Sequence, residues 1–138
     1  MENLKDTIKI VVPGIPKSQK RHRFGRGFTY DPSKQDKTTF LSLVREQAPE
    51  HPILGPIALK VRFTMPRPKH HSRTGKYSHL LKDHAPKYHS VKPDLDNLVK
   101  LISDVLQPDF YVDDSQVVKL QAEKVYGKPR TEIIIEEI

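Results

Sequence analysis

The sequence predicts a single α+β domain with a small mixed β-sheet, two main helices and a C-terminal β-hairpin. Its length of 138 residues suits one ordinary domain and is too short for two substantial ones. Segments with strand-like alternation and segments with helical spacing of apolar residues are mixed without a regular strand–helix–strand rhythm. The sequence has no internal repeat and no low-complexity tract, so residues 1–138 are expected to form one domain.

Four segments alternate between apolar and polar residues, which is the pattern of half-buried strands. The first, 8–12, stops at a Pro-Gly pair, and the second, 57–65, alternates throughout. The last two, 116–126 and 131–138, are separated by the short turn Gly-Lys-Pro-Arg. This spacing predicts that the last two strands form a hairpin.

Two segments place apolar residues at helical spacing. The first helix is predicted at 34–48, where Asp31 or Ser33 can cap its start and a proline follows its end. The second is predicted at 97–107, where Asp96 occupies the expected N-cap position and a proline follows. Each of these segments has one apolar stripe, as expected of an amphipathic helix.

The absence of cysteine excludes several classes of protein. Thiol catalysis, Cys-ligated zinc, iron–sulfur clusters and a disulfide scaffold all require a residue that this sequence lacks. No run of 18 apolar residues occurs, and the first residues lack the apolar core of a signal peptide. A soluble, cytoplasmic protein without membrane association is therefore expected.

The basic residues are concentrated in two segments. Lys and Arg number 24 against 17 Asp and Glu, and 13–30 and 66–92 carry net charges of +5 and +6, whereas the remainder is mildly acidic. This distribution is typical of a protein that binds a polyanion such as DNA. The alternative is a basic domain whose two loops are merely rich in lysine. The candidate DNA-binding residues are Lys17, Lys20, Arg21, Arg23, Arg26, Arg73, Lys76, Lys82 and Lys92.

Both basic segments carry rings among their cations. In the first, Phe24, Phe28 and Tyr30 can either stack on bases or pin the loop to the core. The second lacks periodicity over 66–91, which predicts a long flexible basic loop, and it holds five of the seven histidines. A zinc site is the alternative there, but no consistent ligand spacing supports it. Solvated histidines near a phosphate backbone are the favoured interpretation.

An acidic group begins immediately after the second basic segment. Asp94 and Asp96 are two residues apart, and in an extended segment both carboxylates would point to one side, about 7 Å apart. Lys100 and Asp104 follow at four-residue intervals, so they share one helix face with Asp96. That face lies beside or opposite the apolar stripe and is expected to be accessible. A second acidic pair, Asp113-Asp114, follows the helix.

Carboxylates beside a basic surface suit metal-assisted hydrolysis of phosphodiesters. Mg²⁺ prefers oxygen ligands and can be held by one or two carboxylates together with water and substrate phosphate. The ion then activates water or stabilises the leaving oxygen, and a neighbouring lysine can neutralise charge that develops on the phosphate.

Each of these residues also has an ordinary structural interpretation. Asp96 can be only a helix cap, the helical lysine can form a simple i,i+4 ion pair, and Asp113-Asp114 can be only a turn. An EF-hand is excluded, because Val99 and Val105 occupy the positions that require Gly and Glu.

The acidic group resembles the signature of a known family. The segment from Lys92 to Lys100 reads Lys-Pro-Asp-Leu-Asp-Asn-Leu-Val-Lys, and Asp104-Val-Leu and then Val112-Asp-Asp-Ser-Gln-Val follow it. This combination resembles the RusA family of Holliday junction resolvases. The first strand, its basic loop, the 57–65 strand and the two C-terminal strands extend the resemblance over nearly the whole chain.

The resemblance implies a homodimeric, Mg²⁺-dependent endonuclease that makes paired nicks in four-way junction DNA during recombination or repair. Mn²⁺ is the expected substitute, and no organic cofactor is expected. By position, Asp94 and Asp96 match the first two catalytic acids and metal ligands of the family, and Lys100 matches its catalytic lysine. The third acid lies within Asp113-Asp114, of which Asp114 is favoured. The alternative is a non-catalytic protein that binds junction or duplex DNA and whose acids are structural.

Overall fold

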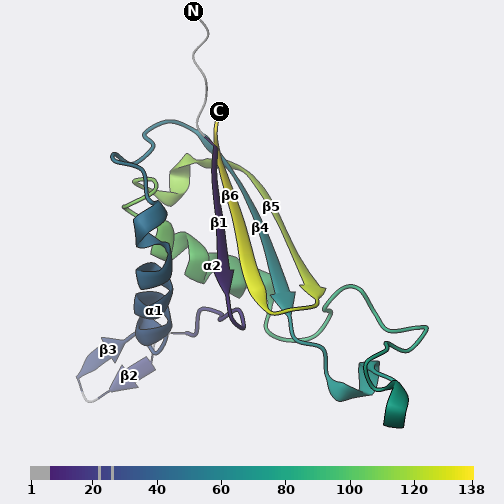
Figure 1. Cartoon of the computed structure of the whole chain (residues 1–138). Coiled ribbons are helices and arrows are strands. Elements are labelled where there is room, and N and C mark those ends of the chain that lie inside the picture. The colour runs from purple at the N-terminus through teal and green to yellow at the C-terminus, as the bar shows by residue number, and fades with distance from the viewer. Residues whose placement is uncertain (1–6, 22, 26) are drawn as a thin grey trace, which may run out of the picture.

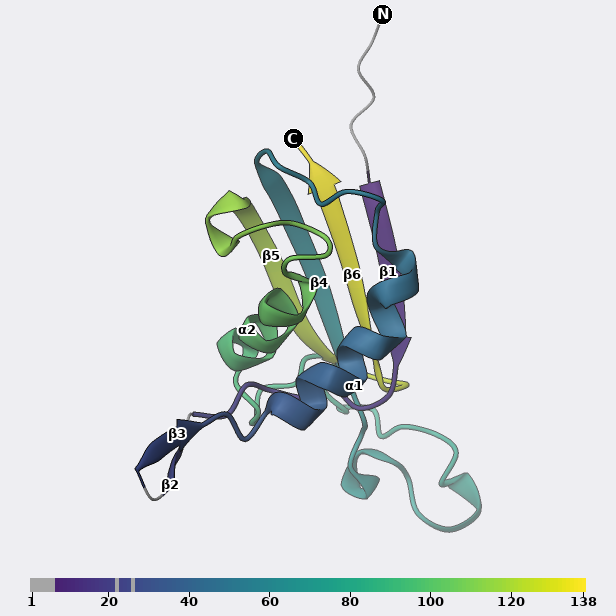
Figure 2. The ribbon, with the colours of Figure 1, turned by 90° about the vertical axis from the view of Figure 1, so that its left-hand side faces the viewer.

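The computed structural model describes residues 7–21, 23–25 and 27–138 and shows a sheet covered on one face by two helices (Figures 1 and 2). The sheet has four strands in the order β1-β6-β4-β5, and a separate two-stranded hairpin, β2-β3, projects from the body. This arrangement confirms the predicted α+β class. The strands are β1 (Thr7–Pro13), β2 (Arg23–Gly25), β3 (Phe28–Tyr30), β4 (Ile57–Met65), β5 (Val117–Tyr126) and β6 (Arg130–Glu137).

The sheet is mixed, as predicted, but the prediction that the last two strands pair with each other as a hairpin is wrong. Strand β6 pairs antiparallel with both β1 and β4, whereas β5 pairs only with β4 within the sheet, in parallel. The turn between β5 and β6 crosses the end of β4, where Gly127 N donates to Met65 O at 2.9 Å. The two strands are thus consecutive in the chain but separated in the sheet by β4. The most deeply buried strand, β4, takes the position between them.

Helix α1 (Lys34–Val44) is followed by a single 3₁₀ turn, η1 (Arg45–Gln47). The α-helical part is therefore shorter than the predicted helix at 34–48. Ser33 occupies the N-cap position of α1, and its Oγ accepts from Lys20 N at 2.7 Å. Helix α2 (Leu95–Leu106) begins two residues earlier than predicted. Its N-cap is therefore Asp94 and not Asp96.

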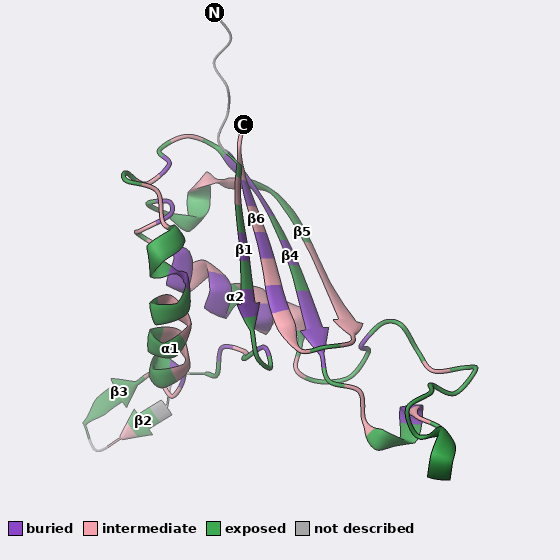
Figure 3. Ribbon diagram, in the orientation of Figure 1, coloured by how far each residue is buried: buried purple, intermediate pink, exposed green. Residues whose placement is uncertain are grey.

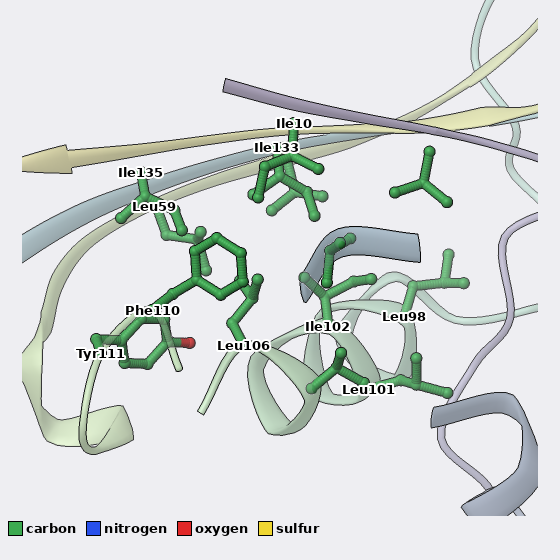
Figure 4. Close-up of a cluster of buried hydrophobic side chains, with 14 of the residues drawn as sticks. Ile10, Leu59, Leu98, Leu101, Ile102, Leu106, Phe110, Tyr111, Ile133 and Ile135 are labelled. Atoms are coloured by element: carbon green, nitrogen blue, oxygen red, sulfur yellow. The ribbon is translucent and has the colours of Figure 1, made fainter. Parts of the chain in front are cut away.

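The core lies between α2 and the sheet (Figure 4). Leu98, Ile102 and Leu106 of α2 are almost completely buried and face Leu59 and Ile133 of the sheet. Complete burial of one such side chain contributes about 1.5–3 kcal/mol, so these contacts fix the orientation of α2. The polar side of the helix is consequently left on the surface. None of the described helices is long and apolar enough to cross a membrane.

The 66–91 segment contains two 3₁₀ turns, η2 (Lys69–His71) and η3 (Gly75–Tyr77), and extends away from the sheet (Figure 3). His71 and His89 are buried against the ring of Tyr126, with ring centroids 4.7 and 5.0 Å apart. The expectation that all the histidines of this segment are solvated is therefore wrong for these two. The sequence interpretation missed them because loop histidines carry no periodic signal of burial. Flexibility of the remainder stays a prediction.

Candidate functional site

Asp94 and Asp96 lie at the beginning of α2. Asp94 follows a cis Lys92–Pro93 peptide and has an extended backbone, whereas Asp96 already lies in the first helical turn. The two residues therefore lie at the N-terminus of a helix and do not form an extended pair. Asp94 makes no side-chain capping bond, Asp96 accepts a hydrogen bond from Asn97 N at 3.0 Å, and both residues are exposed. Negative charge is favourable at this end of a helix.

The turn before Asp94 is held by a lysine of β5. Lys124 Nζ donates to Val91 O at 2.8 Å and to Pro93 O at 2.6 Å. Lys124 lies opposite Phe63 of β4, whose side chain belongs to the core, and the backbone of His89 also bonds to Lys124 O. The sequence interpretation missed Lys124. The available signal was a lysine at an inward-facing position of an alternating strand.

The first basic segment is attached to the same end of α2. Gln19 N donates to Asn97 O at 2.9 Å, and the Gln19 side chain donates to Asp31 Oδ1 at 3.0 Å. Beyond this anchor the chain forms the β2-β3 hairpin. The hairpin and the 66–92 segment both leave the body at the end of the sheet where β4 ends (Figures 1 and 2). Both basic segments are therefore tied to the backbone around Asp94 and Asp96.

The aromatic side chains of the hairpin are exposed. Phe24 is 86% exposed, Phe28 59% and Tyr30 41%, so these rings do not pin the loop to the core. The alternative of base stacking is the one that remains. Of the candidate cations, Arg26 and the side chain of Arg23 lie outside the described residues. The others are all exposed: Lys17, Lys20, Arg21, Arg73, Lys76, Lys82 and Lys92.

The second acidic pair lies near the other end of α2. Asp113 caps the short 3₁₀ turn η4 (Asp114–Gln116), and hydrogen bonds from Ser115 lower the pKa of its carboxyl. Asp114 instead accepts hydrogen bonds from Ser103 Oγ and Gln107 Nε2 of α2. Of the pair, Asp114 is therefore the acid that is bonded to α2.

Ser103 connects Asp114 to the core. Its Oγ also lies 3.0 Å from the hydroxyl of Tyr111, and burial raises the pKa of Tyr111 to about 12. The tyrosine therefore keeps its proton and supports this end of the α2 surface at neutral pH.

The candidate acids form a row along α2 and not a cluster. Asp96, Lys100, Ser103 and Gln107 lie on one stripe of the helix, so Lys100 stands between Asp96 and the position of Asp114. Asp96 and Ser103 are about 10 Å apart along the axis, whereas two ligands of one Mg²⁺ lie about 4 Å apart at most. Accordingly, the described residues contain no group of three or more His, Asp or Glu close enough to hold a metal.

Asp104 belongs to a different contact. Its carboxylate pairs with Lys37 of α1 at 3.1 Å, and Lys37 also bonds to Asp31 at 2.8 Å. That hydrogen bond from Lys37 holds the pKa of the Asp31 carboxyl at about 2. Asp104 therefore joins α2 to α1, and its carboxylate is occupied by this ion pair.

Comparison with protein-family models matches residues 13–136 to the family described as endodeoxyribonuclease RusA. The chain belongs to the RusA endodeoxyribonuclease family. The matched region includes both basic segments and all the acids of α2 and η4. The chain is also similar to an uncharacterized protein, YqaN, of Bacillus subtilis (strain 168), with 38% identity over 143 aligned residues that cover 96% of this chain and 98% of YqaN.

Proposed function

We propose that this RusA-family protein is a Mg²⁺-dependent endodeoxyribonuclease that resolves four-way DNA junctions by paired phosphodiester hydrolysis in recombination or repair. The observation that carries this proposal is the attachment of two basic, exposed segments to the backbone around Asp94 and Asp96. Gln19 connects one segment to the first turn of α2, and Lys124 connects the other. DNA held by both segments would pass next to the two carboxylates.

The exposed carboxylates fit a hard divalent cation. Asp94 and Asp96 would hold Mg²⁺, or Mn²⁺ as its substitute, together with water and a substrate phosphate. The ion, when bound, supplies Lewis-acid stabilisation of negative charge on the phosphate. Lys100, one turn beyond Asp96, would stabilise the same developing charge from the protein side.

Asp114 is the favoured third acid, and its position supports that choice over Asp113. Asp113 uses its carboxylate to cap its own turn, whereas Asp114 is bonded to the α2 stripe that carries Asp96 and Lys100. Within one chain, however, Asp114 stands too far along α2 to share an ion with Asp96. A homodimer removes this difficulty, because a two-fold axis near the middle of α2 would set opposite ends of two α2 helices side by side.

The open edge of β5 supports the homodimer. Among the described residues, only Tyr88 bridges β5 on the side away from β4, at Val125. Val118 and Leu120 of the same strand are 58% and 56% exposed. An unpaired, partly apolar strand edge is a surface that a second copy can cover. Sedimentation equilibrium of the full chain is expected to give a dimer, and a monomer at micromolar concentration would contradict this.

The proposed activity is tested with a synthetic four-way junction and a duplex of the same sequence. Paired nicks in the junction that require Mg²⁺ or Mn²⁺, and that EDTA prevents, are the expected result. The alternative function, non-catalytic binding of junction or duplex DNA, is favoured by the row-like spacing of the acids. Tight junction binding without cleavage in either metal would establish that alternative instead.

Lys124→Met is expected to lower cleavage by about tenfold or more, because a charged hydrogen bond contributes about 1.5–3 kcal/mol. The variant removes both bonds to the turn that positions Asp94. The Mg²⁺ concentration for half-maximal cleavage should rise, while junction binding in EDTA changes little. Lys119→Met, an exposed lysine of the same strand, is the matched control. Equal losses in binding and cleavage would show that Lys124 only contacts DNA.

Neutralising the second basic segment is expected to weaken junction binding and its salt dependence. The triple change of Arg73, Lys76 and Lys82 to alanine should reduce the slope of log affinity against log salt by up to about three phosphate contacts. Salt-titrated anisotropy of a labelled junction in EDTA measures this slope. An unchanged slope would mean that the segment faces away from DNA.

The matched control for this experiment removes the same number of charges elsewhere. Three exposed lysines lie on the sheet face away from the helices, and their replacement should leave the slope nearly unchanged. They are Lys9, Lys60 and Lys119.

A further inference from the structure

The 66–91 segment folds back on itself around an open hollow of about 660 Å³. Backbone bonds join the two sides of the fold: Arg73 N donates to Leu80 O at 2.9 Å, and Lys82 N donates to His71 O at 2.9 Å. The guanidinium of Arg67 donates to Pro86 O at 2.8 Å. The hollow is therefore built by specific contacts, at a distance from the acids of α2.

Half of the residues that line the hollow carry, or can gain, positive charge: His70, Arg73, Lys82 and His84. Arg73 forms an ion pair with Asp83 at 2.9 Å and also donates to Leu81 O. Its guanidinium is therefore largely occupied by partners within the segment. No ion pair of the described residues includes Lys82. His70 and His84 are also exposed in the lining, as are Asp83 and Pro86.

We propose that this hollow is a phosphate subsite for the DNA backbone, and that protonation of His70 and His84 strengthens it as the pH falls from 8 to 6. The ligand is a phosphodiester, because the exposed lining offers the Lys82 ammonium and two imidazoles, while its one carboxylate, Asp83, is paired with Arg73. This inference rests on the proposed function for the identity of the DNA, but it requires neither cleavage nor a metal ion.

The histidines of this segment differ in their burial and in their neighbours. His70 packs edge-on against His71, with ring centroids 4.7 Å apart, and Arg67 and Lys82 also lie near this pair. Burial, followed by the charges of His70 and Arg67, lowers the pKa of His71. The ring of His71, which packs against Tyr126, therefore gains a proton less readily than an ordinary imidazole.

His84 also lines the hollow, together with Arg73, Lys82 and Asp83. Imidazole is the side chain that ordinarily changes its charge between pH 5 and 8, so exposed histidines can follow the pH in this range. Of the five histidines in the segment, His70 and His84 are thus the two that line the hollow and remain exposed.

The experiment compares junction binding by the full chain in EDTA at pH 6 and pH 8 at constant ionic strength. The unmodified protein is expected to bind about three- to tenfold more tightly at pH 6, as two exposed ionic contacts are added. The double variant His70→Gln with His84→Gln should lose most of this gain and keep its affinity at pH 8. His79→Gln, an exposed histidine of the same segment outside the hollow, should retain the gain.

Two outcomes overturn the subsite: a protein whose affinity does not depend on pH, and a double variant that keeps the whole gain. If the chain binds no junction at all, the proposed function fails separately. The subsite is then decided with inorganic phosphate, by following the imidazole C–H signals of His70 and His84 by NMR. Titration midpoints that rise with added phosphate support it, and midpoints that do not move overturn it.

Discussion

Asp94→Asn and Asp96→Asn are each expected to abolish junction cleavage while leaving binding in metal-free buffer intact or tighter. Each change removes a candidate Mg²⁺ ligand and one negative charge beside the DNA phosphates. Loss of one essential catalytic carboxylate typically lowers the rate by about 10⁴-fold, which is indistinguishable from no cleavage in a gel assay. Rates are measured on a labelled four-way junction in Mg²⁺, and affinities in EDTA.

The control for these variants is another acid in the first turn of a helix. Asp36 holds this position in α1, so Asp36→Asn loses a comparable interaction with a helix dipole without touching the candidate site. Cleavage by Asp36→Asn at the wild-type rate, together with wild-type-like cleavage by Asp96→Asn, would refute the metal site. Thermal unfolding of all the variants shows whether any loss of activity reflects loss of structure.

Asp114→Asn is expected to abolish cleavage as well, with Asp113→Asn as its neighbouring comparison. Asp113→Asn removes the charge from a cap of a single 3₁₀ turn, so it should mainly affect stability. An inactive Asp113→Asn beside an active Asp114→Asn would mean that the third acid is Asp113, while the rest of the site would stand.

The sequence predicted the local structure better than the contacts between distant segments. The predicted 57–65 strand has the bounds of β4, because strict alternation and flanking prolines define a strand within its own residues. Which strands pair depends on packing between residues that are distant in the sequence, and the alternation of apolar and polar residues carries no information about it. For that reason the β5-β6 hairpin was wrong: β4 lies between the two strands.

The same limit applies to the candidate site. The acids and Lys100 stand out in the sequence because their residue types and spacing are local. The sequence predicts Asp96 as the cap, but either aspartate can cap a helix, and only the backbone shows that Asp94 holds that position. The anchoring role of Lys124 depends on carbonyls more than 30 residues away in the sequence, so no local pattern indicates it.

Lys100→Ala is expected to lower the cleavage rate by about 10²- to 10³-fold, the loss typical when one group that stabilises transition-state charge is removed. Junction affinity in EDTA should change little, since Lys100 is one of 24 Lys and Arg residues. No ion pair of the described residues includes Lys100, so its ammonium is available to a phosphate. Single-turnover cleavage at saturating protein isolates the rate from binding.

Lys60→Ala is the matched control, because Lys60 is an exposed lysine on the sheet face away from α2. It should cleave and bind like the unmodified protein. Lys100→Arg keeps the charge but changes its shape and hydration, so partial rescue by this variant would indicate that charge beside the scissile phosphate is what Lys100 provides. Equal losses of rate and affinity in Lys100→Ala would instead make Lys100 a general phosphate contact. The row of Asp96, Lys100 and Asp114 would then lack its catalytic cation, and the non-catalytic alternative would gain support.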